Sequence, residues 1–130
     1  NPRYTASIEV LERSCRFRAI DLHAAACLGG RLPQAYSTAD VVRSGKVVLY
    51  SPKALCIPTD SYAAWLQPGR STWPAWADIP APGTAIPAGM PLVTALNSAR
   101  EEHTLQQLLR TQAAQVWHDL ESPAFDTGVR

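Results

Sequence analysis

The sequence has few cysteines, no excess of either charge and no apolar run long enough to span a membrane. Its 3 cysteines are widely spaced, and no CxxC pair occurs. This pattern suggests neither a zinc ribbon nor a disulfide framework, and it fits reduced thiols in a cytoplasmic protein. The 12 basic and 11 acidic residues nearly balance. The sequence therefore predicts no nucleic-acid partner and no membrane partner, because both require concentrated positive charge.

The chain is long enough and apolar enough to form a real core. It has 130 residues, of which 46% are hydrophobic and 18% charged. Disorder along the whole chain is therefore not expected. Helical patterns at both ends and strand patterns between them predict an α+β fold.

The first of two helices predicted in residues 1–30 has an apolar and a charged face. Thr5 and Ser7 are both suitable caps for its start. Its apolar face, which we expect to be buried, consists of Ile8, Leu11 and Cys15. Its charged face consists of Glu9, Glu12 and Arg13. Two glutamates at this spacing are more typical of a solvated face than of a general acid/base pair.

The second helix is predicted to begin at a capping Asp21 and to end at Gly29-Gly30. His23 lies in this helix, and no acid or nucleophile is linked to it by spacing, so we interpret it as a structural histidine. His103 and His118 lie too far apart to form a metal pair.

Strands are expected in the middle of the chain. A turn at Ser44-Gly45 is predicted to lead into a strand over residues 47–50, with residues 55–57 as a short partner strand. From Pro58 to Pro91 the prolines recur too often for a helix. Turns at Pro82-Gly83 and Ala88-Gly89 are expected there instead, with a short strand between them and a further strand over residues 92–96.

The same proline-rich segment contains three of the four tryptophans, Trp65, Trp73 and Trp76. They either clamp a long loop onto the β domain or face a partner or substrate. Packing is favoured, because a proline-rich loop needs such anchors to stay ordered.

The last element expected is an amphipathic helix over residues 99–120, followed by a flexible tail over residues 121–130. Ser98 and Glu101 have the spacing of a capping box. One face of the helix is apolar and consists of Leu105, Leu108, Leu109, Ala113, Val116 and Leu120.

The first three residues carry the strongest chemical signal. The amide oxygen of Asn1 is a hard ligand suited to Mg²⁺, and the guanidinium of Arg3 can hold phosphate or acyl-phosphate oxygens bidentately. Alone, such a tripeptide also occurs by chance in turns and specifies no function. The residues that follow give it a context: Asn1-Pro2-Arg3-Tyr4-Thr5-Ala6-Ser7-Ile8-Glu9-Val10-Leu11-Glu12.

This stretch resembles the end of the catalytic core of ATP-grasp ligases, where a strand ends in a Glu-x-Asn-x-Arg motif and leads into a helix. Residues 19–27 are similar to the next helix of that core. Residues 45–50 and 77–84 resemble the small C-terminal β domain that follows it. The resemblance covers residues 1–118, and it is closest to predicted ATP-dependent carboligases related to biotin carboxylase.

The resemblance implies a function and an organisation. Residues 1–30 would be the C-terminal end of the ATP-grasp core, and residues 31–120 a small antiparallel β domain of barrel-sandwich type closed by the terminal helix. Asn1 would bind the Mg²⁺ that bridges ATP phosphates, and Arg3 would hold the phosphate or acyl-phosphate during catalysis. The partner Glu of the motif and the ATP-binding strands would precede Asn1. The parent enzyme would ligate a small-molecule carboxylate to an amine, a thiol or a similar acceptor, and a homo-oligomer is compatible with it. This fragment alone would be inactive.

A non-catalytic binding or protein-interaction module is the alternative. Residues 83–92 resemble half of a biotinyl or lipoyl barrel-sandwich, whose cofactor is carried on a lysine at a hairpin tip. Lys46 and Lys53 are the only lysines, and neither has the sequence setting that such carriers use.

Overall fold

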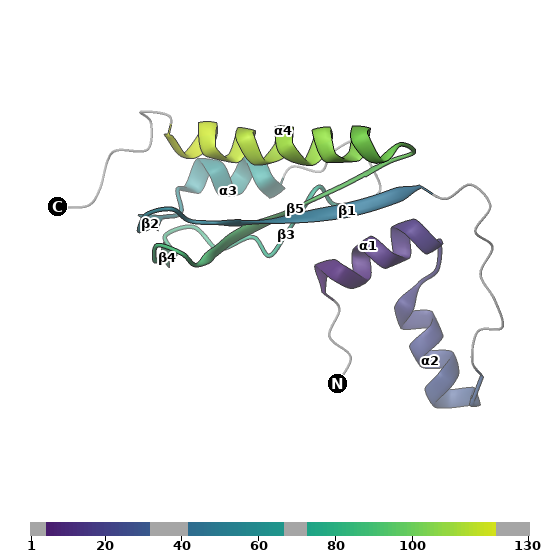
Figure 1. Cartoon of the computed structure of the whole chain (residues 1–130). Helices are drawn as coiled ribbons and strands as arrows, with labels where there is room; N and C mark the ends of the chain where they lie inside the picture. Colours follow the sequence, from purple (N-terminus) through teal and green to yellow (C-terminus); the bar gives the residue numbers. More distant parts are fainter. Residues whose placement is uncertain (1–4, 32–41, 67–72, 122–130) are drawn as a thin grey trace.

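The computed structural model describes residues 5–31, 42–66 and 73–121. The protein is an α+β protein with helices on both sides of a small antiparallel sheet (Figure 1). The elements are α1 (Ala6–Cys15), α2 (Ala19–Gly29), β1 (Arg43–Tyr50), β2 (Leu55–Cys56), α3 (Thr59–Leu66), β3 (Trp76–Ala77), β4 (Ala85–Ile86), β5 (Pro91–Ala99) and α4 (Glu102–Glu121).

The central strand of the sheet is β5, which pairs antiparallel with β1 on one side and β3 on the other. Along β1 the register runs from Arg43 opposite Ala99 to Leu49 opposite Val93, with an irregularity after Leu49. The short strands β2 and β4 pair with each other in a separate ladder.

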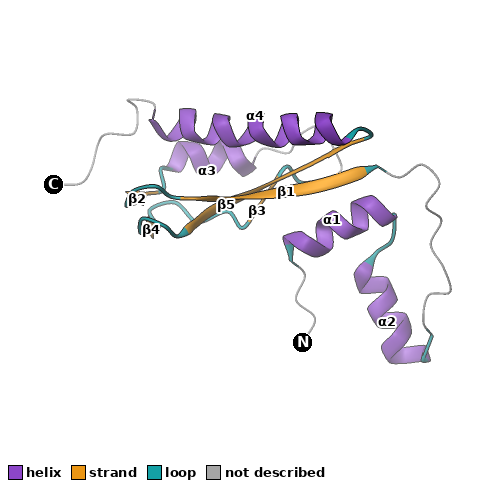
Figure 2. Ribbon diagram, viewed as in Figure 1, coloured by secondary structure: helices purple, strands orange, loops and turns teal. Residues whose placement is uncertain are grey.

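The hydrophobic core lies between the sheet and α4 (Figure 2). Val116 of α4 is fully buried, and it clusters with Leu49 of β1 and Val93 of β5. At Gly45 the helix comes so close that a Cβ would lie 3.2 Å from the Leu109 side chain. A glycine at this position of β1 therefore allows α4 to pack directly onto the strand.

Helix α1 packs on the opposite face of the sheet, against β1 and β5. Its buried residues are Ala6, Glu9 and Glu12, whereas Leu11 is 52% exposed. The expected orientation of this helix is therefore wrong, because its charged face is turned inward. The reason is that Glu9 and Glu12 both find partners near the sheet, which the helical pattern alone does not reveal.

Several local expectations also change. An eight-residue helix, α3, fits between Pro58 and Pro68, so the proline-rich segment does contain a helix. Ser44 and Gly45 lie inside β1 rather than in a turn. The partner of β2 is β4, because a bend after Tyr50 directs the chain away from β1.

The first residues of α4 and α2 differ from the expected ones. Helix α4 begins at Glu102, and Ser98 belongs to β5, so the two do not form a capping box. Helix α2 begins at Ala19, upstream of Asp21. Thr5 precedes α1 but its side chain makes no capping hydrogen bond.

Other expectations are confirmed. The turns at Pro82-Gly83 and Ala88-Gly89 are present, as are β4 and β5. Helix α2 ends at Gly30 in the left-handed region, with φ of 58°. Leu105 and Val116 of the terminal helix are buried, although Leu108 is 38% exposed. No helix in the described ranges is long and apolar enough to cross a bilayer.

Candidate functional site

The two residues that carry the sequence prediction, Asn1 and Arg3, lie outside the described residues. The described chain starts at Thr5, and α1 begins at Ala6, three residues after Arg3. Of the tail expected over residues 121–130, Glu121 is the last residue of α4, and residues 122–130 lie outside the described part.

A cavity of about 760 Å³ lies where α1, the α1–α2 connection and one end of the sheet meet. We call it the arginine cavity, because Arg13, Arg16 and Arg18 line it. Its aromatic lining consists of Phe17 and Trp73. The remaining lining residues are Glu12, Val42 and Ser98.

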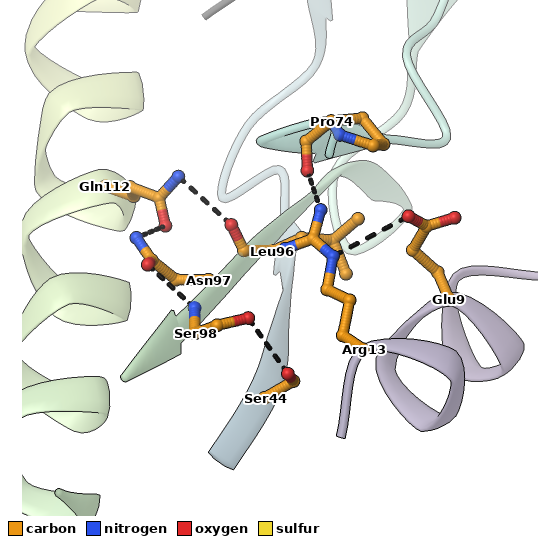
Figure 3. Close-up of polar contacts among 8 residues, drawn as sticks. All are labelled: Glu9, Arg13, Ser44, Pro74, Leu96, Asn97, Ser98 and Gln112. Carbon is orange, nitrogen blue, oxygen red and sulfur yellow. Dashed lines mark hydrogen bonds and ion pairs between the residues drawn. The ribbon is translucent and has the colours of Figure 1, made fainter. Parts of the chain in front are cut away.

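Arg13 fastens α1 to the segment that precedes β3. Its Nε lies 3.6 Å from a carboxylate oxygen of Glu9, one helical turn earlier, and both side chains are buried (Figure 3). A terminal nitrogen of the same guanidinium donates to the carbonyl oxygen of Pro74. The guanidinium also lies over the ring of Trp73, 5.3 Å from its centroid. Arg13 is thus held by charge, by a hydrogen bond and by a cation–π contact.

Glu12 links α1 to the first residue of α2. Its carboxylate accepts a hydrogen bond of 2.5 Å from the backbone N–H of Ala19, the first residue of α2. This is the capping interaction that neither Arg18 nor Asp21 supplies, and a negative charge at a helix N-terminus is favourable. Glu12 therefore has a positioning role for the α1–α2 connection.

Arg16 ends α1 in the left-handed region, with φ of 52°. Arg18 lies two residues on, and its Nε is 3.5 Å from Asp21 in a pair whose side chains are 78% and 64% exposed. Such an exposed pair holds the guanidinium only weakly. Both arginines line the cavity with their charge available to solvent or to a ligand.

The tryptophans divide between the two roles that the sequence left open. Trp65 is 4% exposed and packs against Trp76 with ring centroids 6.3 Å apart, so these two anchor the core. Trp73 is 39% exposed and belongs to the arginine cavity.

Polar side chains join the adjacent ends of β1 and β5 to each other and to the middle of α4. Ser44 and Ser98 share a hydrogen bond of 2.9 Å across the strands (Figure 3). Asn97 donates to Gln112 of α4 and accepts from the N–H of Ser98. These bonds fix the end of β5 that presents Ser98 to the cavity.

The motif residues near 77–84 have structural partners. Asp78, at φ of 54°, accepts a hydrogen bond of 2.6 Å from the buried hydroxyl of Thr94. Gly83 donates its N–H to the carbonyl of Ile57, and Ile57 donates to Thr84. This segment therefore ties the loop before β4 to the core.

Other candidate chemistry is sparse within residues 5–31, 42–66 and 73–121. No three histidine, cysteine or acidic side chains there are grouped as metal ligands. His23 and Cys27 face each other on α2 with the sulfur 3.6 Å from Nε2, and both are exposed. Glu9 and Glu12, expected on a solvated face, are buried and make structural contacts.

Sequence reasoning missed the arginine cavity. The sequence feature that could have indicated it is the run Arg16-Phe17-Arg18 between the two helices, in which an aromatic residue stands between two cationic ones.

Comparison with protein-family models, curated proteins and solved structures finds no match to this chain.

Proposed function

We propose that the chain is the C-terminal part of an ATP-grasp ligase, in which Asn1 contributes to the Mg²⁺ site and Arg3 holds the phosphate or acyl-phosphate. In the parent reaction a carboxylate takes the γ-phosphoryl group of Mg-ATP and releases ADP, and an amine, thiol or similar acceptor then attacks the acyl-phosphate and displaces inorganic phosphate. Its chemistry is charge neutralisation and positioning around a phosphoryl group, to which an amide oxygen and a guanidinium are suited.

The observation that best supports this proposal is the surface of α2. Asp21 is its only charged side chain, yet none of its residues is buried. Leu28 is 89% exposed and Ile20 53% exposed. A helix with so few polar side chains is normally covered by other elements. In the proposal, the ATP-grasp core supplies that cover.

The order of the elements is also compatible with the proposal. The Asn-x-Arg segment is followed by α1, then by α2, which ends at a glycine pair. An antiparallel sheet comes next, and α4 closes its core. The resemblance implies two helices, a small antiparallel β domain and a terminal helix, and the described elements are compatible with that order.

A lysine-linked carrier receives less support. Lys46 lies inside β1, and its Nζ donates to the hydroxyl of Ser7, 2.7 Å away. Lys53 is exposed between β1 and β2, two strands that do not pair with each other. Neither lysine is therefore at the tip of a hairpin.

The deciding experiment begins with the coding sequence upstream of Asn1. We expect an open frame of about two hundred codons, with Glu two positions before Asn1. Supplied with a panel of small carboxylates, the full-length protein should then release ADP from Mg-ATP and convert one of them to an acyl-phosphate that hydroxylamine traps. We expect Asn1→Ala and Arg3→Ala to lower this rate by at least about a hundredfold. Arg110→Ala, an exposed change on α4, is the matched control.

Two results would contradict the proposal. One is a start codon or a processing site directly before Asn1, which would favour an interaction module. The other is full activity of the Asn1→Ala and Arg3→Ala proteins, which would remove both residues from the chemistry.

A further inference from the structure

The arginine cavity has the size and the lining of a small-molecule site. Its volume of about 760 Å³ falls within the range of ligand pockets in proteins. Phe17, Val42 and Trp73 form its apolar lining, and its polar lining consists of Glu12, Arg13, Arg16, Arg18 and Ser98.

The charge of the lining favours an anion. Three arginines and one glutamate line the cavity. Arg13 is already paired with Glu9, and Glu12 accepts the N–H of Ala19. Arg18 is paired only with the exposed Asp21, a weak contact, so Arg16 and Arg18 are the two guanidiniums that a ligand can engage. A guanidinium is a planar fork that binds phosphate or carboxylate oxygens bidentately.

Arg16 stands where the backbone favours glycine. It ends α1 with φ of 52°, and Gly30 ends α2 with φ of 58°. A non-glycine residue in this conformation costs free energy, and such residues concentrate at binding sites. Within the described residues, no hydrogen bond or ion pair of Arg16 explains why this position holds an arginine and not a glycine. Its side chain lines the cavity, which gives the arginine a reason to replace glycine.

The aromatic lining favours a flat ring on the ligand. Trp73 is much more exposed than the core residue Trp65, 39% against 4%. The guanidinium of Arg13 lies over the Trp73 ring and holds it at the cavity. Phe17, between the two arginines in sequence, adds a second ring. Aromatic rings of ligands stack on such side chains and on arginine.

We infer that the arginine cavity binds an organic anion that carries an aromatic ring, with Arg16 and Arg18 on the anionic group and Trp73 and Phe17 on the ring. This inference goes beyond the proposed ligase function and does not rest on it. Its test needs neither ATP nor a catalytic core.

The experiment titrates the 130-residue chain with 1-naphthyl phosphate and follows the heat of binding and the indole N–H signals by NMR. Inorganic phosphate and 1-naphthol are the matched half-probes, and 1-naphthoate tests a carboxylate in place of the phosphate. We expect either ring-bearing anion to bind at least about tenfold more tightly than each half-probe, because charge and stacking act together. The signal of Trp73, assigned by its loss in Trp73→Phe, should shift most.

Variants separate a binding role from a structural one. Arg16→Gln and Arg18→Gln should each weaken binding about tenfold, the loss of one charge-assisted contact. Arg110→Gln, on the exposed face of α4, should leave the affinity unchanged. Arg16→Gly is the sharpest variant. It should weaken binding equally while raising the melting temperature by about 5 °C, since glycine relieves the left-handed backbone.

The inference is overturned if 1-naphthol or inorganic phosphate binds as tightly as 1-naphthyl phosphate. It is also overturned if Arg110→Gln lowers the affinity as much as Arg16→Gln. A shift confined to the signals of tryptophans other than Trp73 would place the ligand elsewhere.

Discussion

Replacing Arg13 by glutamine should destabilise the protein far more than a surface charge change does. The Arg13 side chain is 7% exposed and that of its partner Glu9 is 10% exposed, with 3.6 Å between Nε and the carboxylate. The substitution removes this pair, the bond to the Pro74 carbonyl and the contact with Trp73. Removing one member of a buried pair costs about 3–5 kcal/mol, because the other charge stays in a poorly solvated place.

We expect a loss near the lower end, about 3 kcal/mol, since glutamine retains some hydrogen bonding. With a urea m-value of about 1.5 kcal/mol/M, the unfolding midpoint should fall by about 2 M. Arg18→Gln is the matched control, because its partner Asp21 is exposed and the pair is worth about 0–1 kcal/mol. Both midpoints can be read from the same fluorescence assay.

Adding Glu9→Gln to Arg13→Gln tests the reasoning itself. If the pair is coupled, the double variant should be about 2 kcal/mol more stable than the sum of the single changes predicts. A midpoint for Arg13→Gln within 0.5 M of that for Arg18→Gln, on the same order-of-magnitude scale, would refute the reasoning. The reasoning would also be refuted if the losses of unfolding free energy in the two single variants added up to the loss in the double variant.

Three further changes test other parts of the structure. Glu12→Ala should speed amide exchange at Ala19 and the next residues about tenfold, because the capping carboxylate is lost, whereas Glu12→Gln should speed it less. Leu105→Ala should lower the unfolding free energy measured in urea by about 2–3 kcal/mol, and Leu108→Ala by less than about 1 kcal/mol. The reason is that Leu105 is 8% exposed and Leu108 38% exposed. Equal losses would contradict the burial of the Leu105 side of α4. Gly83→Ala should lower the unfolding free energy by about 1 kcal/mol in the same assay. Its φ is 76° and no atom lies close enough to clash with a Cβ, so the loss comes from backbone strain alone. An unchanged midpoint would argue against that turn.

The strands and turns after residue 80 could be predicted because local chemistry determines them. Gly83 and Gly89 occupy left-handed turn positions, and the residues of β5 alternate between two covered faces. The long apolar stripe of α4 likewise faces the core, with the exception of Leu108. In these elements the pattern and the tertiary packing agree.

Helix α1 could not be predicted in the same way. Its helical spacing is correct, but which face is buried depends on partners far away in sequence. Arg13 meets Pro74, 61 residues on, and Lys46 meets Ser7 across 39 residues. A charged face that is neutralised by such contacts resembles a solvated face in any local pattern.

The arginine cavity was also invisible to local patterns, for a related reason. Val42, Trp73 and Ser98 come to the α1–α2 connection only through the sheet. Only the lining residues between Glu12 and Arg18 are close together in sequence. The predicted catalytic residues, Asn1 and Arg3, lie outside the described residues and stay a prediction.

The central place of β5 has a consequence for how the chain is made. Both of its neighbours in the sheet, β1 and β3, are synthesised before it, and Ser44 precedes its hydrogen-bond partner Ser98 by 54 residues. At about 10 residues per second, a ribosome would leave β1 unpaired for about 5 s. The strand edge and the apolar residues that α4 later covers are exposed to other nascent chains during that interval. Slowing translation before β5 should therefore lower the yield of folded protein.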